Sequence, residues 1–162
     1  MKGAEVVMVR RKGVSDSPCP VARALDVIGD RWTLLIIRDA FDDVRRFGAF
    51  QSNLGIARNI LADRLRSLEE GGIMQAVPAS DGSVYQDYVL TPRGESLFPV
   101  IVALRQWGEG HLFARGEAHS TLVERATGKP VPRLMLEGRD GKPLAPGHTY
   151  VKKLLPRNAS AQ

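Results

Sequence analysis

Two groups of residues in this sequence have types and spacing that could do chemistry. The first is a polar stretch between residues 45 and 66 that contains several arginines and asparagines. The side chains of arginine and asparagine match the hydrogen-bonding edges of guanine and adenine in the DNA major groove. The second is Cys19, the single cysteine of the chain. The sequence therefore suggests two possible activities, recognition of DNA bases and thiol chemistry.

The polar stretch is expected to form an outward helix face over residues 57–66. Leu61, Leu65 and Leu68 repeat at helical spacing and should face inward, which turns the polar residues outward. The N-terminal residues of such a helix are those that reach bases. A polar face is also what any solvated helix shows, so this interpretation stays open. The candidate base-reading residues are Ala57, Arg58, Asn59, Asp63 and Arg66.

Side chains just before and within the preceding helix could contact phosphates, which would position a reading helix without specifying sequence. These candidates are Arg45, Arg46, Gln51 and Ser52. For the two arginines, a surface ion pair with Asp42 or Asp43 is an equally good interpretation.

Cys19 directly precedes Pro20 at the expected start of a helix, which makes it the N-cap residue. Unpaired backbone N–H groups and the positive end of the helix dipole favour a thiolate there, and Arg23 could add to this effect. Cys19 is thus a redox or effector candidate. A small structural cap is an equally good interpretation.

No catalytic or metal-binding constellation is recognisable elsewhere. His111, His119 and His148 lack metal-ligand spacing, and the chain has no glycine-rich phosphate loop and no GxSxG motif. Trp32 and Tyr88 are more typical of core residues than of a ligand pocket. We therefore expect no cofactor, no metal and no enzyme activity.

Composition indicates an ordinary globular chain of 162 residues, 43% hydrophobic and 25% charged. No apolar run is long enough to span a membrane and no signal peptide is recognisable, so we expect a cytoplasmic protein. Association with the nucleoid is expected only if the protein binds DNA. The net charge of +5 lies entirely in residues 119–162, which contain 8 Lys and Arg against 3 Asp and Glu. The basic charge therefore does not by itself predict DNA binding by residues 1–118.

Hydrophobic periodicity and turn residues predict a mainly helical α+β domain over residues 18–115, preceded by an arm at 1–17 with a possible strand at 5–9. The expected order is four helices, a β-hairpin and a final helix capped by Thr91, which is the order of a winged helix-turn-helix. Ser83 and Gln86 at the hairpin could approach the minor groove. The expected helices are 20–28, 32–40, 49–54, 58–70 and 92–113, and the expected strands are 73–77 and 84–90.

The last helix has a wide apolar surface, which indicates a partner. The candidate dimer-interface residues are Leu97, Phe98, Ile101, Leu104 and Trp107.

The segment from Cys19 to Ile36 resembles the opening signature of HxlR-type bacterial transcription regulators, relatives of the MarR group. The resemblance continues through residues 46–50, 59–73 and 88–94 and covers roughly residues 19–113. It implies a homodimeric winged helix that usually represses a promoter, and in some members a cysteine at this position senses oxidants or electrophiles. The family often has a basic wing, whereas no Lys or Arg lies between Gly71 and Arg93 here.

Residues 119–155 are expected to form a small β-rich appendage, followed by a disordered tail at 156–162. The appendage resembles a zinc knuckle of longer relatives, with Thr127, Glu137 and Asp140 in place of cysteines, so no metal is expected.

The sequence thus predicts a DNA-binding transcriptional regulator, a homodimeric repressor on a pseudo-palindromic operator, modulated through Cys19 or a small ligand. The alternatives are a winged-helix protein-interaction module and, less favoured, a thiol enzyme.

Overall fold

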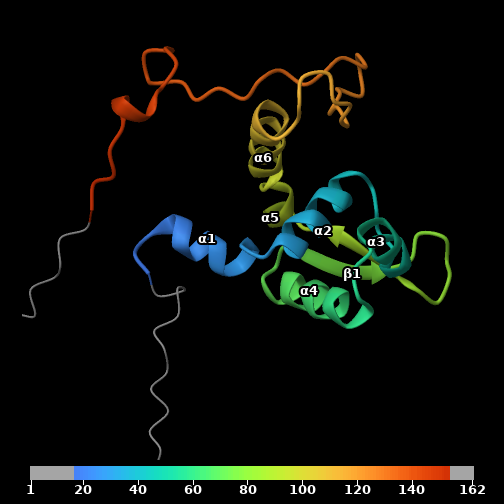
Figure 1. Ribbon diagram of the computed structural model, residues 1–162. Coiled ribbons are helices and arrows are strands. Elements are labelled where there is room, and N and C mark those ends of the chain that lie inside the picture. The colour runs from blue at the N-terminus through green and yellow to red at the C-terminus, as the bar shows by residue number, and fades with distance from the viewer. Residues whose placement is uncertain (1–16, 154–162) are drawn as a thin grey trace, which may run out of the picture. The chain divides into compact units, whose positions relative to one another are not determined.

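The computed structural model describes residues 17–153 (Figure 1). The expected strand at 5–9 and the tail at 156–162 lie outside these residues. Contacts divide the chain into two units, Met1–Phe98 and Pro99–Gln162. The first unit holds the candidate site.

Four helices open the first unit: α1 (Pro20–Ile28), α2 (Arg31–Phe41), α3 (Phe47–Leu54) and α4 (Arg58–Glu70). Asp30 caps α2 by accepting hydrogen bonds from the backbone N–H groups of Trp32 and Thr33 at 3.0 and 3.2 Å. Gly55 ends α3 with a left-handed φ of 60°. These local signals explain why the short helices begin and end close to where the sequence predicts.

The helices enclose a small core, and the expected inward leucines of α4 are confirmed. Leu61, Leu65 and Leu68 are at most 1% exposed, and they share the core with Phe50 and Ile36. In α2, Thr33, Ile37 and Asp39 are buried, whereas Trp32, which the sequence suggests as a core residue, is only half-buried. The polar Asp39 is tolerated there because the Arg38 guanidinium pairs with it at 2.6 Å.

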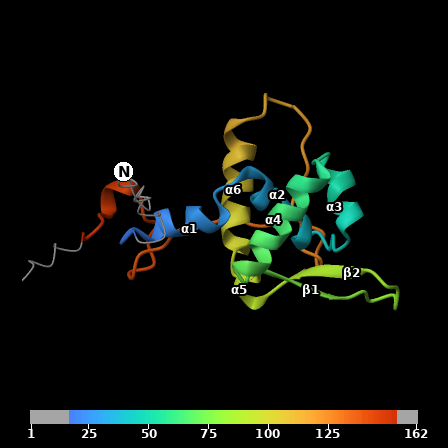
Figure 2. The same ribbon diagram turned by 90° about the horizontal axis from the view of Figure 1, so that it is seen from below.

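A β-hairpin follows α4. Strands β1 (Met74–Pro78) and β2 (Gln86–Leu90) pair antiparallel, with Met74 opposite Leu90 and Pro78 opposite Gln86. β1 contacts α4 and β2 contacts α2. We call this hairpin and its loop, residues 74–90, the wing; Figure 2 shows it running alongside α4 and α3.

The prediction of a single helix over residues 92–113 is wrong. The structure has a short α5 (Pro92–Glu95) and a separate α6 (Phe98–His111). Pro99 explains the break, because it has no N–H to donate to the Glu95 carbonyl and its ring would clash with that carbonyl. Thr91 caps α5 as expected, accepting from the Gly94 N–H at 3.1 Å.

In the second unit, the expected β-rich appendage has no strand within residues 119–153. It contains two isolated antiparallel bridges, Val123 with Pro130 and Glu137 with Pro143, and one 3₁₀ turn at Pro146–His148. Leu136 is 72% exposed and Tyr150 is 88% exposed. These apolar side chains contribute little burial, which explains why no strand pairing is sustained.

Candidate nucleic-acid interface

The N-terminus of α4 presents two of the candidate base-reading residues. Arg58 and Asn59 are exposed, and Arg58 is the first residue of the helix. The Arg58 guanidinium lies over the Phe47 ring of α3, 5.4 Å from its centroid. A cation–π contact of this kind orients the arginine while leaving its N–H groups free to donate.

The remaining members of the base-reading set are exposed, and two of them pair with each other. Arg66 lies 3.3 Å from Asp63 in an i, i+3 ion pair. Ala57 is the N-cap of α4. An exposed pair of this kind is weak, so it does not prevent either side chain from contacting another molecule.

Several predicted residues line one hollow between the helix-turn-helix and the wing, which we call the reading groove. It has a volume of about 680 Å³ and is open to solvent. The predicted residues among its walls are Arg46, Gln51, Arg58 and Gln86, from three separate segments of the chain. The other walls are Phe47, Gly48, Val84, Tyr85 and Tyr88. The fold therefore brings the proposed reading helix, phosphate contacts and wing to one surface.

Arg46 is engaged with the wing. Its Nε lies 2.6 Å from Oδ1 of Asp87, its Nη2 lies 2.7 Å from Oδ2 of Asp81, and its Nη1 donates to Oγ of Ser83 at 3.2 Å. These contacts, first among them the hydrogen bond to Asp81, raise the pKa of Arg46. These wing partners differ from Asp42 and Asp43, the partners considered from the sequence.

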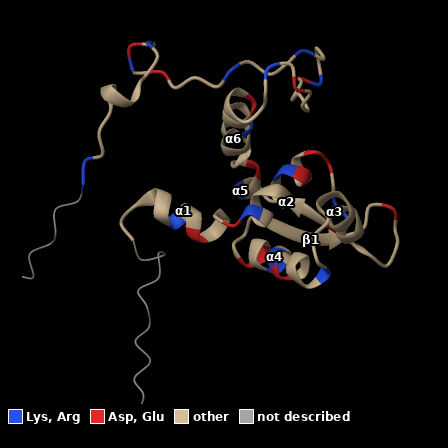
Figure 3. Cartoon of the chain, in the orientation of Figure 1, with Lys and Arg blue, Asp and Glu red and all other residues tan. Residues whose placement is uncertain are grey.

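The wing loop is acidic and apolar. Figure 3 shows an acidic residue on this loop and no basic one, in keeping with the absence of Lys and Arg between Gly71 and Arg93. Val84 is 97% exposed and Tyr85 is 69% exposed. Sequence reasoning missed both residues and the two wing aspartates. Asp87 had a detectable signal, because an acidic residue at an inward strand position requires a partner.

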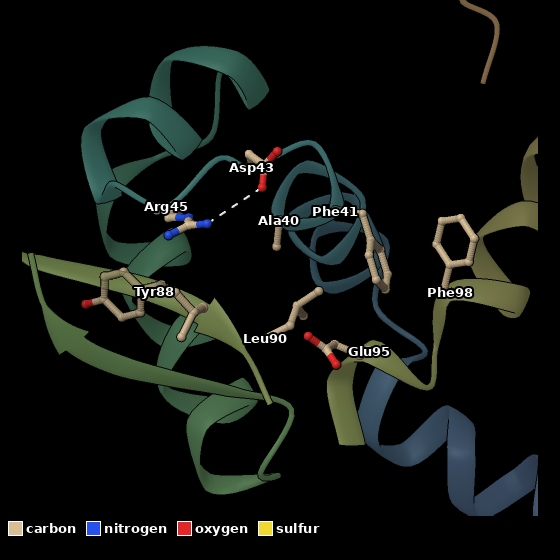
Figure 4. A pocket seen from close by; sticks show the side chains of 9 residues that line it. Ala40, Phe41, Asp43, Arg45, Tyr88, Leu90, Glu95 and Phe98 are labelled. Atoms are coloured by element: carbon tan, nitrogen blue, oxygen red, sulfur yellow. Dashed lines mark ion pairs between the residues drawn. The ribbon is translucent and has the colours of Figure 1, made fainter. Parts of the chain in front are cut away.

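Arg45 lies apart from the reading groove. It is 3.7 Å from Asp43, so one of the two expected ion-pair partners is confirmed. Both residues line a second hollow of about 420 Å³ (Figure 4). Its walls include Phe41 and Phe98, whose rings meet edge to face at 5.1 Å, and Glu95. Tyr88 also lines it, and burial, followed by the charge of Glu69, raises the pKa of the Tyr88 hydroxyl.

Cys19 is the N-cap residue of α1, as expected, and is exposed. Its sulfur makes no capping hydrogen bond to the helix. The Arg23 side chain, which was expected to support a thiolate, donates through Nε to the Ser17 carbonyl at 2.6 Å. The thiol is therefore accessible, with its environment set by the start of α1.

Among residues 17–153, no group of three or more His, Cys, Asp or Glu is arranged to hold a metal, and no helix is long and apolar enough to cross a membrane. In the appendage, Thr127 donates to Glu124 at 2.8 Å and Asp140 lies 3.7 Å from Lys142. The knuckle-like turns are thus closed by side-chain contacts.

Comparison with known proteins shows similarity to helix-turn-helix regulators. An uncharacterised HTH-type transcriptional regulator of Mycobacterium tuberculosis (strain ATCC 25618 / H37Rv) is 51% identical over 92 residues, which cover 57% of this chain and 58% of the relative. The chain therefore spans somewhat over half the length of the mycobacterial relatives that it matches. The matched relatives are named as regulators and not as enzymes.

Solved structures share the fold. The crystal structure of the candidate transcription factor PA1607 is 57% identical, with a TM-score of 0.82, and the match covers 86% of this chain and 97% of that one. The redox regulator HypR in its reduced form is 31% identical, with a TM-score of 0.53, and the match covers 58% of this chain and 94% of that one.

A family model described as HxlR-like helix-turn-helix matches residues 27–115, the segment that contains α2, the reading groove and α6. This segment is more than half of the chain, and it has the winged helix-turn-helix order of elements. The chain therefore belongs to the HxlR-like helix-turn-helix family.

Proposed function

We propose that the protein is a transcriptional regulator that binds a specific DNA duplex through α4 and the reading groove. The observation that carries this proposal is the exposed Arg58–Asn59 pair at the start of α4, beside a groove walled by the wing. Arginine and asparagine at the N-terminus of a recognition helix are suited to base edges. Gln51 on the wall of the groove and the exposed Ser52 beside it in α3 supply polar groups for the DNA backbone. Arg45, outside the groove, is a further candidate for a backbone contact.

The regulator acts as a homodimer on a pseudo-palindromic operator, with one α4 in each of two successive major grooves. Exposed apolar side chains on two helices support the dimer. On α6, Leu104 is 49% and Trp107 is 57% exposed; on α1, Val21 is 65% and Leu25 is 57% exposed. Exposed apolar side chains that gather in a patch mark protein–protein interaction sites. Bound over a promoter, such a dimer represses by occlusion.

Cys19 modulates DNA binding through oxidation or alkylation. It is accessible, and it begins a helix whose apolar residues belong to the proposed dimer surface. A bulky or cross-linked sulfur at this position would change the spacing of the two α4 helices. HypR, which shares the fold, is a redox regulator with structures in reduced and oxidised forms. A small molecule in the second hollow, which Phe41 and Phe98 line, is the alternative effector.

Selection from a random duplex library with the purified full chain tests the DNA-binding proposal. The expected result is enrichment of one two-fold symmetric sequence, bound with an affinity that falls steeply as salt rises. A library that stays unenriched, with no salt-dependent affinity for any duplex, would favour a protein-interaction module instead.

A further inference from the structure

We propose that Arg46 is a wing-positioning residue, whose guanidinium sets the width of the reading groove by holding Asp81 and Asp87 instead of binding a DNA phosphate. This inference rests on the proposed function, because the width of the groove matters for binding only if the groove receives DNA.

All three nitrogens of the Arg46 guanidinium face the wing. Nε meets Asp87, Nη2 meets Asp81 and Nη1 donates to Ser83, at 2.6, 2.7 and 3.2 Å. The planar guanidinium has five donors in a fixed fork, so one side chain bridges several acceptors at once. The same group lies 5.9 Å from the centroid of the Tyr85 ring. Each of the three guanidinium nitrogens is thus within 3.2 Å of an oxygen of the wing.

The burial of Asp87 opposes any movement of Arg46 toward DNA. The Asp87 side chain is only 4% exposed, and its Oδ2 accepts from the backbone N–H and the hydroxyl of Ser80, both at 3.2 Å. A buried carboxylate that loses its cation is strongly destabilised. The wing segment has no Lys or Arg of its own between Gly71 and Arg93. A shift of Arg46 to a phosphate would therefore leave Asp87 without a cation from its own segment.

Because Arg46 lies just before α3 and its partners lie in the wing, its side-chain contacts hold two walls of the groove together. Arg46 immediately precedes α3, Asp81 and Ser83 lie in the wing loop, and Asp87 lies on β2. The backbone N–H of Tyr88 donates to the Arg45 carbonyl at 2.8 Å, which already ties β2 to the same segment. The Arg46 side chain adds the tie to the loop, on which Val84 and Tyr85 form the far wall of the groove.

Arg46→Lys and Arg45→Lys form a matched pair of variants. Both keep the positive charge, but a lysine ammonium is a point charge that cannot reproduce the fork. Amide hydrogen exchange is measured without DNA at Ser80 and Ser83, whose N–H groups donate to Asp87 and Asp81. Affinity for the selected duplex is measured as a function of salt.

For Arg46→Lys we expect exchange at these two amides to rise about tenfold, and affinity to fall about tenfold with an unchanged salt slope, because the wing opens locally while charge is kept. Arg45→Lys should leave the exchange at its wild-type rate. Unchanged exchange in Arg46→Lys would overturn the proposal. So would Arg46→Ala if it lowered the salt slope by about 1 per subunit without faster exchange, which is the signature of a phosphate contact.

Asp81→Asn keeps the proposal testable if the Arg46 variants fail to fold. Asp81 is exposed, so this change weakens the contact to the loop and leaves the Arg46–Asp87 pair in place. Faster exchange at Ser83 is expected, and a wild-type rate there counts against the proposal. If wild-type protein selects no duplex, the proposed function fails, while the exchange data alone decide whether Arg46 holds the wing.

Discussion

Arg58 is exposed in the first turn of α4, and its guanidinium lies over the ring of Phe47. If it reads a base, Arg58→Ala should weaken operator binding by about 1–3 kcal/mol and relax the preference at one base pair. The measurement is the affinity for the selected duplex and for its single-base variants. Arg93→Ala, which removes an exposed arginine from α5, is the control.

How the loss of affinity is distributed over the duplexes distinguishes the possible roles of Arg58. Equal weakening on all duplexes, with a salt slope smaller by about 1, would assign it to a phosphate. Wild-type affinity in Arg58→Ala would remove the start of α4 from the reading role.

Cys19→Ser should preserve DNA affinity and abolish the response to peroxide and quinone. Serine keeps a small N-cap residue at the start of α1 but has no thiolate to oxidise. With one cysteine per chain, mass spectrometry distinguishes a disulfide between subunits from one with a small thiol. Identical release of DNA by wild type and Cys19→Ser under oxidant would make Cys19 structural and leave the Phe41–Phe98 hollow as the effector site.

The Asp81 carboxyl gives the wing loop a defined pH dependence. Hydrogen bonds from Ser83 and then the contact with Arg46 lower its pKa to about 2 from the ordinary 3.8. Because the folded pKa is the lower one, the stabilisation is complete above about pH 4 and is lost as the pH falls through about 2. Carboxyl carbon NMR of Asp81 should show this midpoint, and Ser83→Ala should move it toward 3.8. A wild-type midpoint near 3.8 would contradict the loop geometry.

At the scale of elements, the junction between the wing and α5 depends on a glycine. A Cβ at Gly94 would overlap the Ile73 carbonyl oxygen and lie 3.0 Å from Cδ2 of Leu90, whereas a Cβ at Gly48 in α3 has nothing within 4 Å. Gly94→Ala should therefore destabilise the protein by about 1–3 kcal/mol. Gly48→Ala, the matched control, should be neutral or stabilise by up to about 1 kcal/mol. Denaturant unfolding measures both, and equal midpoints would contradict the packing described at Gly94.

Local signals made most elements predictable, and non-local contacts explain the rest. Gly29 and Gly55 are the C-caps of α1 and α3, and Thr91 caps the start of α5 through its side chain, as the sequence predicts. Each of these signals depends only on near neighbours in the chain. The break between α5 and α6 also has a local cause, Pro99. Helical periodicity of apolar residues continues across this proline and therefore does not reveal the break. For Arg46 the sequence leaves a phosphate contact and an ion pair with Asp42 or Asp43 equally open, whereas its contacts with Asp81 and Asp87 join residues far apart in the sequence. Spacing cannot show such pairs before the wing folds back onto α3.

At the scale of the whole molecule, two subunits are needed for two copies of α4 to read successive grooves. Leu104 on α6 is 49% exposed and belongs to the proposed dimer surface. Leu104→Glu should shift the protein from dimer to monomer, because a carboxylate buried at an apolar interface is costly. Sedimentation of wild type and variant checks this, with Ala103→Glu on the same helix as the control. A monomeric wild type at the concentration used for DNA binding would contradict the dimer.

Hydroxyl-radical footprinting of the full chain on its selected duplex tests the central claim most directly. A dimer that places one α4 in each of two major grooves should protect two symmetric patches about 34–36 Å apart, one helical turn of DNA. The wing should add a flanking protection on the outer side of each patch. A single unpaired patch, or two patches at a spacing that does not match a whole number of turns, would contradict binding by a two-fold symmetric pair of reading helices.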